Sequence, residues 1–322
     1  MSQLNRFNEP IRCLGQDLVR PECVLANERG EIFVSDFRGG VSVIKPDGTQ
    51  QFYGGCCEEV GVLQTNGFAL LKDGSFLIAH LGQEQGGVFR LTRDNEISPF
   101  LLEVDGIALP PTNFVYLDYL GRIWITVSTC VQPRAYAYRS NVSNGFIVLV
   151  DKKGPRIVAD NIGYTNECWV NPEGTELYVN ATFGRQLVRY HLDADGNASA
   201  PEVIAAFGAG TYPDGLTGDT EGNLWVTSII SNRVIKVAPD GSQTIMLEEF
   251  DSDHLETAED AYLEHRMGRP HLDNNPASLK NISSLAFSGT DLSMITLGCL
   301  LDNQVYQIQS QATGLKPAHW HF

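Results

Sequence analysis

The sequence is poor in positive charge. Its 23 lysine and arginine residues stand against 39 aspartate and glutamate residues, which gives a formal net charge of -16 at pH 7. A surface of that sign repels polyanions, so nucleic acids and acidic membranes are not expected as partners. A divalent cation or a small neutral or cationic substrate is compatible with the same field.

Paired cysteines and long apolar runs are also missing. The seven cysteines include no CxxC pair, which argues against a disulfide framework and a closed zinc site. The most apolar stretch, residues 285–301, is interrupted by Gly289, Asp291 and Gly298, so no membrane span is expected. The first residues lack the apolar core of a signal peptide, and the cytosol is the expected location.

What the sequence does contain is a repeat. A polar residue opens a short apolar strand, a turn with glycine follows, and a second strand rich in β-branched and aromatic residues begins ten or eleven residues after the polar residue in the first five copies. Three of the second strands read IFVSDF, IWITVS and LWVTSI. The polar residues that open the six copies are Glu22, Asn66, Asn113, Asn166, Asp214 and Ser283.

Six units of about four short strands each predict an all-β, six-bladed β-propeller formed by one domain, residues 1–322. A solenoid of the same repeat is the alternative architecture, but the DG and PDG turns favour the propeller. Residues 1–20 are expected to form an N-terminal arm. A helical insertion of about residues 247–280 is expected between blades 5 and 6, where it could mediate association of two copies.

The innermost strand of each blade lines the central channel, so the six polar residues are expected to form a ring around the axis. Burying two carboxylates and three amides there costs several kcal/mol per ionised group unless a cation compensates. A ligand set made only of oxygen atoms favours Ca²⁺, and Mg²⁺, Mn²⁺ or Zn²⁺ are the alternatives. The competing interpretation is that these residues only cap turns at strand starts, but Glu22 is a poor turn residue.

Four phrases resemble those of the SMP-30/gluconolactonase/LRE-like family. They read RPECVLANERGEIFVSD, NFVYLDYLGRIWITV, TNECWVNPEGTELYV and PDGLTGDTEGNLWVTS. The resemblance implies a six-bladed propeller, a divalent metal in its channel and lactone-hydrolysing activity. It also implies that Glu22, Asn166 and Asp214 hold the metal and that Asn113 lies near metal and substrate.

The chain also departs from the family pattern. Pro111 stands where sugar-acid lactonases usually carry arginine, Phe114 where aspartate often follows the asparagine, and Glu167 where glycine is common. These differences predict a channel mouth that is less cationic and more apolar than a gluconolactone site.

The candidate roles follow. Asp214 is the candidate catalytic residue, and Asn113, Asn66, Phe114 and His80 are candidate substrate contacts. His80 ends the second strand of its copy, where it could act at the channel mouth or be a structural, hydrogen-bonded residue.

The sequence thus predicts a divalent-metal-dependent hydrolase of a small lactone or related ester. Water would attack a carbonyl that the metal polarises. A phosphotriesterase-like hydrolase could use the same ion, and a non-catalytic propeller could keep the ion for stability while it binds a ligand. The sequence specifies neither the substrate, nor the native metal, nor the oligomeric state.

Overall fold

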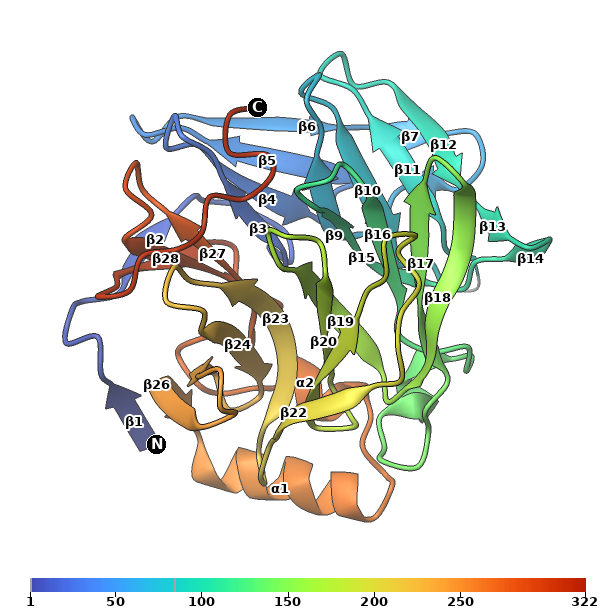
Figure 1. Ribbon diagram of the computed structural model, residues 1–322. Helices are drawn as coiled ribbons and strands as arrows, with labels where there is room; N and C mark the ends of the chain where they lie inside the picture. The colour runs from blue at the N-terminus through green and yellow to red at the C-terminus, as the bar shows by residue number, and fades with distance from the viewer. Residues whose placement is uncertain (1, 84) are drawn as a thin grey trace.

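Six antiparallel sheets are arranged as the blades of a propeller in a computed structural model that describes residues 2–83 and 85–322 (Figure 1). The predicted all-β six-bladed propeller is confirmed. In every blade the first strand of the repeat is the innermost. Around the axis the inner strands contact one another from blade 2 to blade 6 and from blade 6 to blade 1, and the inner strand of blade 2 contacts the second strand of blade 1. The polar residue that opens each copy is therefore placed at the hub.

Blades 1 to 4 are each built from consecutive strands, running from the innermost outward. Blade 1 comprises β3 (Val24–Ala26), β4 (Ile32–Asp36), β5 (Gly40–Ile44) and β6 (Gln50–Gly54). Blade 2 comprises β9 (Thr65–Leu70), β10 (Phe76–His80), β11 (Val88–Leu91) and β12 (Ile97–Leu101). Blade 3 comprises β15 (Thr112–Leu117), β16 (Ile123–Val127), β17 (Gly145–Asp151) and β18 (Gly154–Ile162). Blade 4 comprises β19 (Thr165–Val170), β20 (Glu176–Ala181), β21 (Gln186–His191) and β22 (Glu202–Ala206).

The last two blades each take an outer strand from the N-terminal segment. Blade 5 comprises β23 (Tyr212–Gly218), β24 (Leu224–Ile229), β25 (Arg233–Val237), β26 (Gln243–Phe250) and β1 (Ser2–Asn5). Blade 6 comprises β27 (Ile282–Ser288), β28 (Met294–Cys299), β29 (Val305–Gln309) and β2 (Arg12–Leu14). The segment expected as an arm thus closes the ring, because β2 pairs with β29 from the opposite end of the chain.

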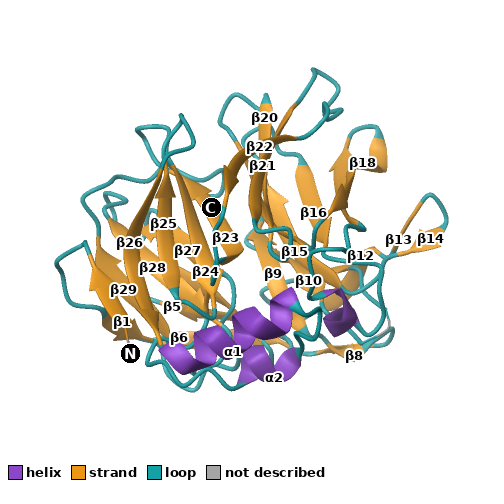
Figure 2. Cartoon of the chain, turned by 90° about the horizontal axis from the view of Figure 1, so that it is seen from below, coloured by secondary structure: helices purple, strands orange, loops and turns teal. Residues whose placement is uncertain are grey.

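Smaller elements decorate this frame. Two short hairpins are formed by β7 (Cys56–Cys57) with β8 (Gly61–Val62) and by β13 (Glu103–Val104) with β14 (Ile107–Ala108). The other elements are the 3-10 helix η1 (Arg134–Ala137) and the helices α1 (Ser252–Leu263) and α2 (Arg269–Asp273). Both helices fall in the expected insertion, and Figure 2 shows them together at one side of the strands. The N-terminus of α1 is capped by Asp251, whose side chain accepts from the backbone N–H of His254.

The turns of the repeat explain why its strands pair in register. In blade 5 the carboxylate of Asp219 accepts hydrogen bonds from the backbone N–H groups of Glu221 and Asn223, the amide of Asn223, and the indole N–H of Trp225 at 2.8 Å. Gly222 sits in the left-handed region at φ 82°, as this turn requires. Asp118 makes the equivalent bond to the Trp124 indole in blade 3.

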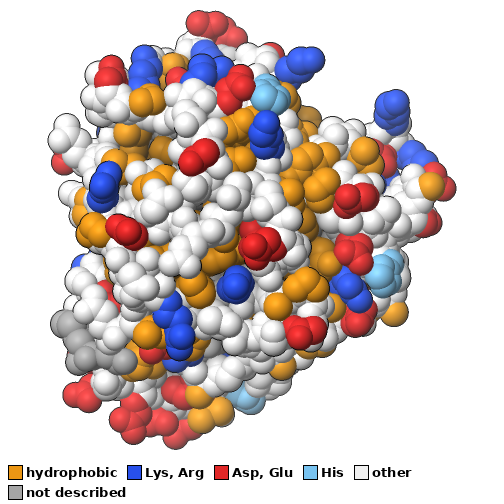
Figure 3. All heavy atoms as spheres, turned by 60° about the vertical axis from the view of Figure 1, so that its left-hand side comes forward, with side chains coloured by type: hydrophobic (Ala, Val, Ile, Leu, Met, Phe, Trp, Pro, Cys, Tyr) orange, Lys and Arg blue, Asp and Glu red, His pale blue; other side chains and the backbone are white. Residues whose placement is uncertain are grey.

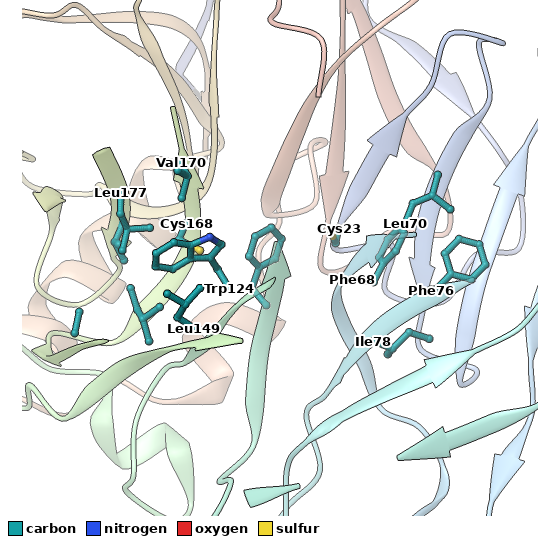
Figure 4. Packing of buried hydrophobic residues seen from close by; sticks show 14 of the residues in the cluster. Cys23, Phe68, Leu70, Phe76, Ile78, Trp124, Leu149, Cys168, Val170 and Leu177 are labelled. Carbon is teal, nitrogen blue, oxygen red and sulfur yellow. The ribbon is translucent and has the colours of Figure 1, made fainter. Parts of the chain in front are cut away.

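Apolar side chains fill the space between blades. The largest cluster joins residues of blades 1 to 4, among them Phe68, Phe76 and Trp124, which are buried completely (Figure 4). The seven cysteines are free thiols, and Cys23 and Cys168 are buried in this same cluster. Their burial among apolar side chains gives these two thiols a packing role.

The Asp219 turn gives a prediction about stability. Asp219→Ala leaves buried N–H donors without an acceptor, so we expect the free energy of unfolding to fall by about 2–4 kcal/mol. Asp240→Ala is the matched control because Asp240 caps an exposed turn through the Ser242 N–H. Urea unfolding of both variants measures the difference. Equal losses at the two positions would contradict this role of Asp219 in the repeat.

Candidate functional site

A cavity of about 670 Å³ lies at the hub, on the side where the helical insertion packs. Its lining includes four of the predicted site residues, Glu22, Asn113, Asn166 and Asp214. The remaining walls come from several segments, among them the loop between β16 and β17, residues 81–83 after β10, and the insertion, which contributes Arg269 and Leu272. We call it the hub cavity.

Hydrogen bonds connect the ring residues directly. The Asn66 amide Nδ2 donates to Glu22 Oε1 at 2.8 Å and to Asn113 Oδ1 at 3.0 Å, and Asn113 Nδ2 donates to Asn166 Oδ1 at 2.7 Å. The Ser283 hydroxyl donates to the Glu22 carbonyl oxygen at 2.9 Å. Residues separated by 44 to 261 positions are therefore hydrogen-bonded to one another at the hub.

Irregularities in strand pairing aim these side chains. In each of blades 2 to 6, the register between the two innermost strands shifts around the ring residue. In blade 5, for example, Pro213 pairs with Ser228 and Leu216 with Val226, which leaves Asp214 and Gly215 unpaired. Such bulges redirect a side chain out of the regular alternation. Because the same register shift occurs in five blades, the ring residues of these blades leave the regular strand pairing, and their side chains point to the hub.

The two hub carboxylates have different surroundings. Arg20 Nη1 lies 2.5 Å from Glu22 Oε2 and donates to Asn66 Oδ1 at 2.7 Å. The Asp214 carboxylate accepts no hydrogen bond from the described residues, although the side chain is only 4% exposed. Burial raises the pKa of Asp214 well above its usual range, and the charges of Glu22 and Glu167 raise it further.

This donor set fits a hard divalent cation. Glu22, Asn166 and Asp214 offer carboxylate and amide oxygens to one cavity, and Asp214 lacks a donor that would stabilise its charge. A cation would compete with Arg20 for Glu22 Oε2. In the described part of the chain no three His, Cys, Asp or Glu side chains gather into a metal-binding group, so the fit depends on the amide oxygens.

Two of the candidate substrate contacts lie elsewhere. Phe114 lines a smaller cavity of about 60 Å³ that the C-terminal segment borders through Leu315, Pro317 and His319. His80 Nδ1 accepts from the backbone N–H of Gln64 at 3.0 Å, and burial lowers the pKa of the imidazole. Neither side chain lines the hub cavity, so the geometry favours the structural interpretation of His80.

Asn66 and Glu167 are placed behind the ring. Asn66 is 1% exposed and does not line the hub cavity, so it positions its neighbours through hydrogen bonds. Glu167 faces the smaller cavity, where its carboxylate accepts from the Leu216 N–H at 2.9 Å. Burial raises the pKa of Glu167 to about 8.

The hub cavity carries positive charge as well as the expected apolar side chains. Three arginines, Arg20, Arg134 and Arg269, line the hub cavity. They come from the segment before β3, from the loop after β16 and from the insertion, which are regions outside the repeat. No repeated phrase marks them, although Arg20 stands two positions before Glu22 in the sequence.

Comparison with known proteins identifies the family of the chain. The family model described as SMP-30/Gluconolactonase/LRE-like region matches residues 21–248, which is more than half of the chain. The chain belongs to this family. Helices α1 and α2 and blade 6 lie beyond the matched residues of the SMP-30/gluconolactonase/LRE-like region.

Similar proteins include lactonases and a calcium-binding protein. The 6-deoxy-6-sulfogluconolactonase of Pseudomonas putida is 27% identical over 178 residues, which cover 54% of this chain and 57% of that protein. The chain spans about half the length of the curated relatives that it matches. Solved structures with the same fold include the calcium-binding regucalcin of Agrobacterium tumefaciens str. C58, with a TM-score of 0.68, 17% identity and coverage of 96% and 98%. A luciferin-regenerating enzyme has a TM-score of 0.70, 17% identity and coverage of 97% and 99%.

In this family member the insertion is packed against the mouth of the propeller. The Arg185 guanidinium binds both carboxylate oxygens of Glu259 on α1, at 2.8 and 2.5 Å, and lies 3.8 Å above the Tyr262 ring. Gly210 N–H also donates to Glu259. Ala258, Ala261 and Tyr262 are buried in an apolar cluster with residues of the loop after β16. None of the helices in the described residues is both long and apolar enough to cross a membrane.

The Glu259 ion pair predicts a pH-dependent contribution to stability. Burial raises the pKa of Glu259, but hydrogen bonds from Arg185 and Gly210 lower it more, so the net shift is downward from 4.5. A lowered pKa in the folded state means that the stabilisation is present above pH 4.5 and is lost as the pH falls below it. We expect Glu259→Gln to cost about 2 kcal/mol at pH 7.

The exposed Glu256 on the same helix supplies the control variant Glu256→Gln. Thermal melts from pH 7 to pH 3.5 should show the stability of Glu259→Gln approaching that of the parent below pH 4.5. A gap that stays constant with pH would refute the assigned ion pair.

Proposed function

We propose that this protein is a divalent-metal-dependent hydrolase of a small lactone, with the hub cavity as its active site. The observation that carries the proposal is the meeting of Glu22, Asn113, Asn166 and Asp214 from four blades in one cavity. Membership of the family and the name of the Pseudomonas putida relative support a lactone as substrate.

In this proposal Glu22, Asn166 and Asp214 hold the metal, with Ca²⁺ preferred. When bound, a divalent cation supplies positive charge that polarises a lactone carbonyl and lowers the pKa of water. The Asp214 carboxylate accepts the proton that the attacking water loses. Asn113 is fixed by Asn66, Asn166 and Arg134, so its amide is oriented before substrate arrives.

Aromatic side chains complete the substrate pocket. Tyr138, Tyr164 and Phe183 line the hub cavity with ring centroids 4.6 to 5.3 Å apart; Tyr138 stacks on Phe183, and Tyr164 meets both rings edge to face. Their faces offer an apolar surface to the carbon skeleton of a ring substrate and exclude bulk water from the carboxylates. The combination of an apolar wall and a charged floor is typical of a pocket for a small polar ring.

A lactone panel tests the activity. After chelation and addition of Ca²⁺, Mg²⁺, Mn²⁺ or Zn²⁺, we expect turnover of at least one sugar lactone. We expect Asp214→Asn to lower kcat at least about 100-fold, because the proton acceptor is gone. Asp193→Asn, in an exposed turn, is the control. Unchanged turnover in Asp214→Asn would remove Asp214 from the mechanism, and no hydrolysis with any ion would favour a non-catalytic binding propeller.

Metal binding is tested separately by stability. Saturation at about 100 times Kd stabilises a folded protein by about 2.7 kcal/mol, so Ca²⁺ should raise the melting temperature of the chelated protein by several degrees. We expect Glu22→Gln to remove most of this shift and the exposed Glu202→Gln to keep it. A full Ca²⁺-induced shift in Glu22→Gln would exclude Glu22 from the metal site.

A further inference from the structure

The charge of the hub cavity is opposite to that of the whole molecule. Among the described residues that line it, two carboxylates, Glu22 and Asp214, face three guanidinium groups, which leaves one positive charge in excess. A divalent cation would raise the excess to three. The chain as a whole carries -16, and acidic and basic side chains are interspersed on the face shown in Figure 3.

The three arginines are not equally neutralised. Arg20 pairs with Glu22 at 2.5 Å, and Arg269 pairs with Asp273 at 2.5 Å. Arg134 has no carboxylate within 4 Å among the described residues. Its guanidinium is held by neutral oxygens, those of the Tyr164 hydroxyl at 2.9 Å and of Asn113 and Ser128 at 3.3 Å. Arg134 is thus the arginine of the cavity wall that contacts no carboxylate of the described residues, and the charges of Glu22 and Asp214 act on it only from a longer distance.

Arg134 keeps hydrogen-bonding capacity for a ligand. Its Nη1 atom is buried and has no hydrogen-bond partner among the described residues. The guanidinium lies 5.4 Å above the Tyr164 ring, so its orientation is fixed by stacking as well as by hydrogen bonds. An immobilised guanidinium with an open donor is suited to carboxylate, sulfonate or phosphate oxygens.

Arg269 adds positive charge from another segment. It is the first residue of α2 and lines the same cavity. Burial lowers the pKa of Arg269, but Tyr138 and Asp273 raise it more, so this side chain stays charged. Tyr138 in turn packs against Tyr164, on which Arg134 stacks. Low-dielectric walls of this kind concentrate the field of the cations within the cavity.

We propose that the substrate carries an anionic group in addition to its lactone ring and that Arg134, assisted by Arg269, binds this group. The inference rests on the proposed lactonase function and names its substrate class. In this arrangement the lactone carbonyl faces the hub carboxylates and the carboxylate, sulfonate or phosphate group faces the arginine wall. A neutral lactone would shield Arg134 from water without supplying an anion to contact it, so it would gain less binding energy than an anionic lactone.

Paired substrates test the proposal. Glucono-1,5-lactone is compared with 6-phosphoglucono-1,5-lactone and with saccharic acid 1,4-lactone, which distinguishes phosphate from carboxylate. We expect kcat/KM to be at least tenfold higher for an anionic lactone, mainly through KM, and the preference to shrink in high salt. Arg134→Gln should reduce the anionic-to-neutral ratio at least tenfold, while Arg134→Lys should retain part of it.

Arg139→Gln is the matched control, because Arg139 lies in the same loop but does not line the cavity. It should leave the ratio unchanged. Thermal melts of the three variants show whether each is folded. A ratio near one in the parent protein, or equal losses on both substrates in Arg134→Gln, would overturn the inference while leaving the lactonase function intact.

A binding experiment separates failure of the inference from failure of the function. Isothermal titration with glucose 6-phosphate and with glucose needs no turnover. We expect the phosphate ester alone to bind and Arg134→Gln to abolish its binding. If glucose 6-phosphate binds but no lactone is hydrolysed, the lactonase proposal is wrong and the anion site is supported. If glucose and glucose 6-phosphate bind equally well, the proposed anion site is wrong.

Discussion

The burial of two carboxylates at the hub of the propeller is the constraint around which the site is organised. Glu22 and Asp214 are 7% and 4% exposed and raise each other's energy, since like charges in a confined space repel. Arg20, the amide of Asn66 and the chain of asparagines relieve part of that cost at Glu22. Asp214 remains without a donor, which explains why a cation would be stabilising there.

The fold was predictable because each blade repeats one local pattern. Turn residues such as Asp219 and Gly222 specify where a strand ends, and alternation within LWVTSI or IFVSDF specifies which face is buried. The ring of polar residues was predictable because its members occupy the equivalent position in the six copies of the repeat. Closure by β1 and β2 was not predictable, because strands Ser2–Asn5 and Arg12–Leu14 pair with partners more than 200 positions away.

The walls of the site were less accessible to sequence reasoning. Phe114 follows Asn113 directly, but strand alternation and the register shift place it in the smaller cavity, away from the hub cavity. The arginines come from loops and from the insertion, whose positions depend on tertiary packing such as that of Tyr262 against Arg185. A substitution at one family position, Pro111, therefore did not reveal the charge of the cavity that other segments supply.

Calcium-site geometry provides the most direct test of the central claim. Anomalous diffraction from crystals of the full chain soaked in Mn²⁺ or Ca²⁺ would locate the ion without reference to activity. The account predicts one strong peak at the hub, about 2–2.6 Å from oxygens of Glu22, Asn166 and Asp214, with Arg20 displaced from Glu22. A hub without a peak, in which Arg20 still pairs with Glu22 at saturating metal, would contradict it.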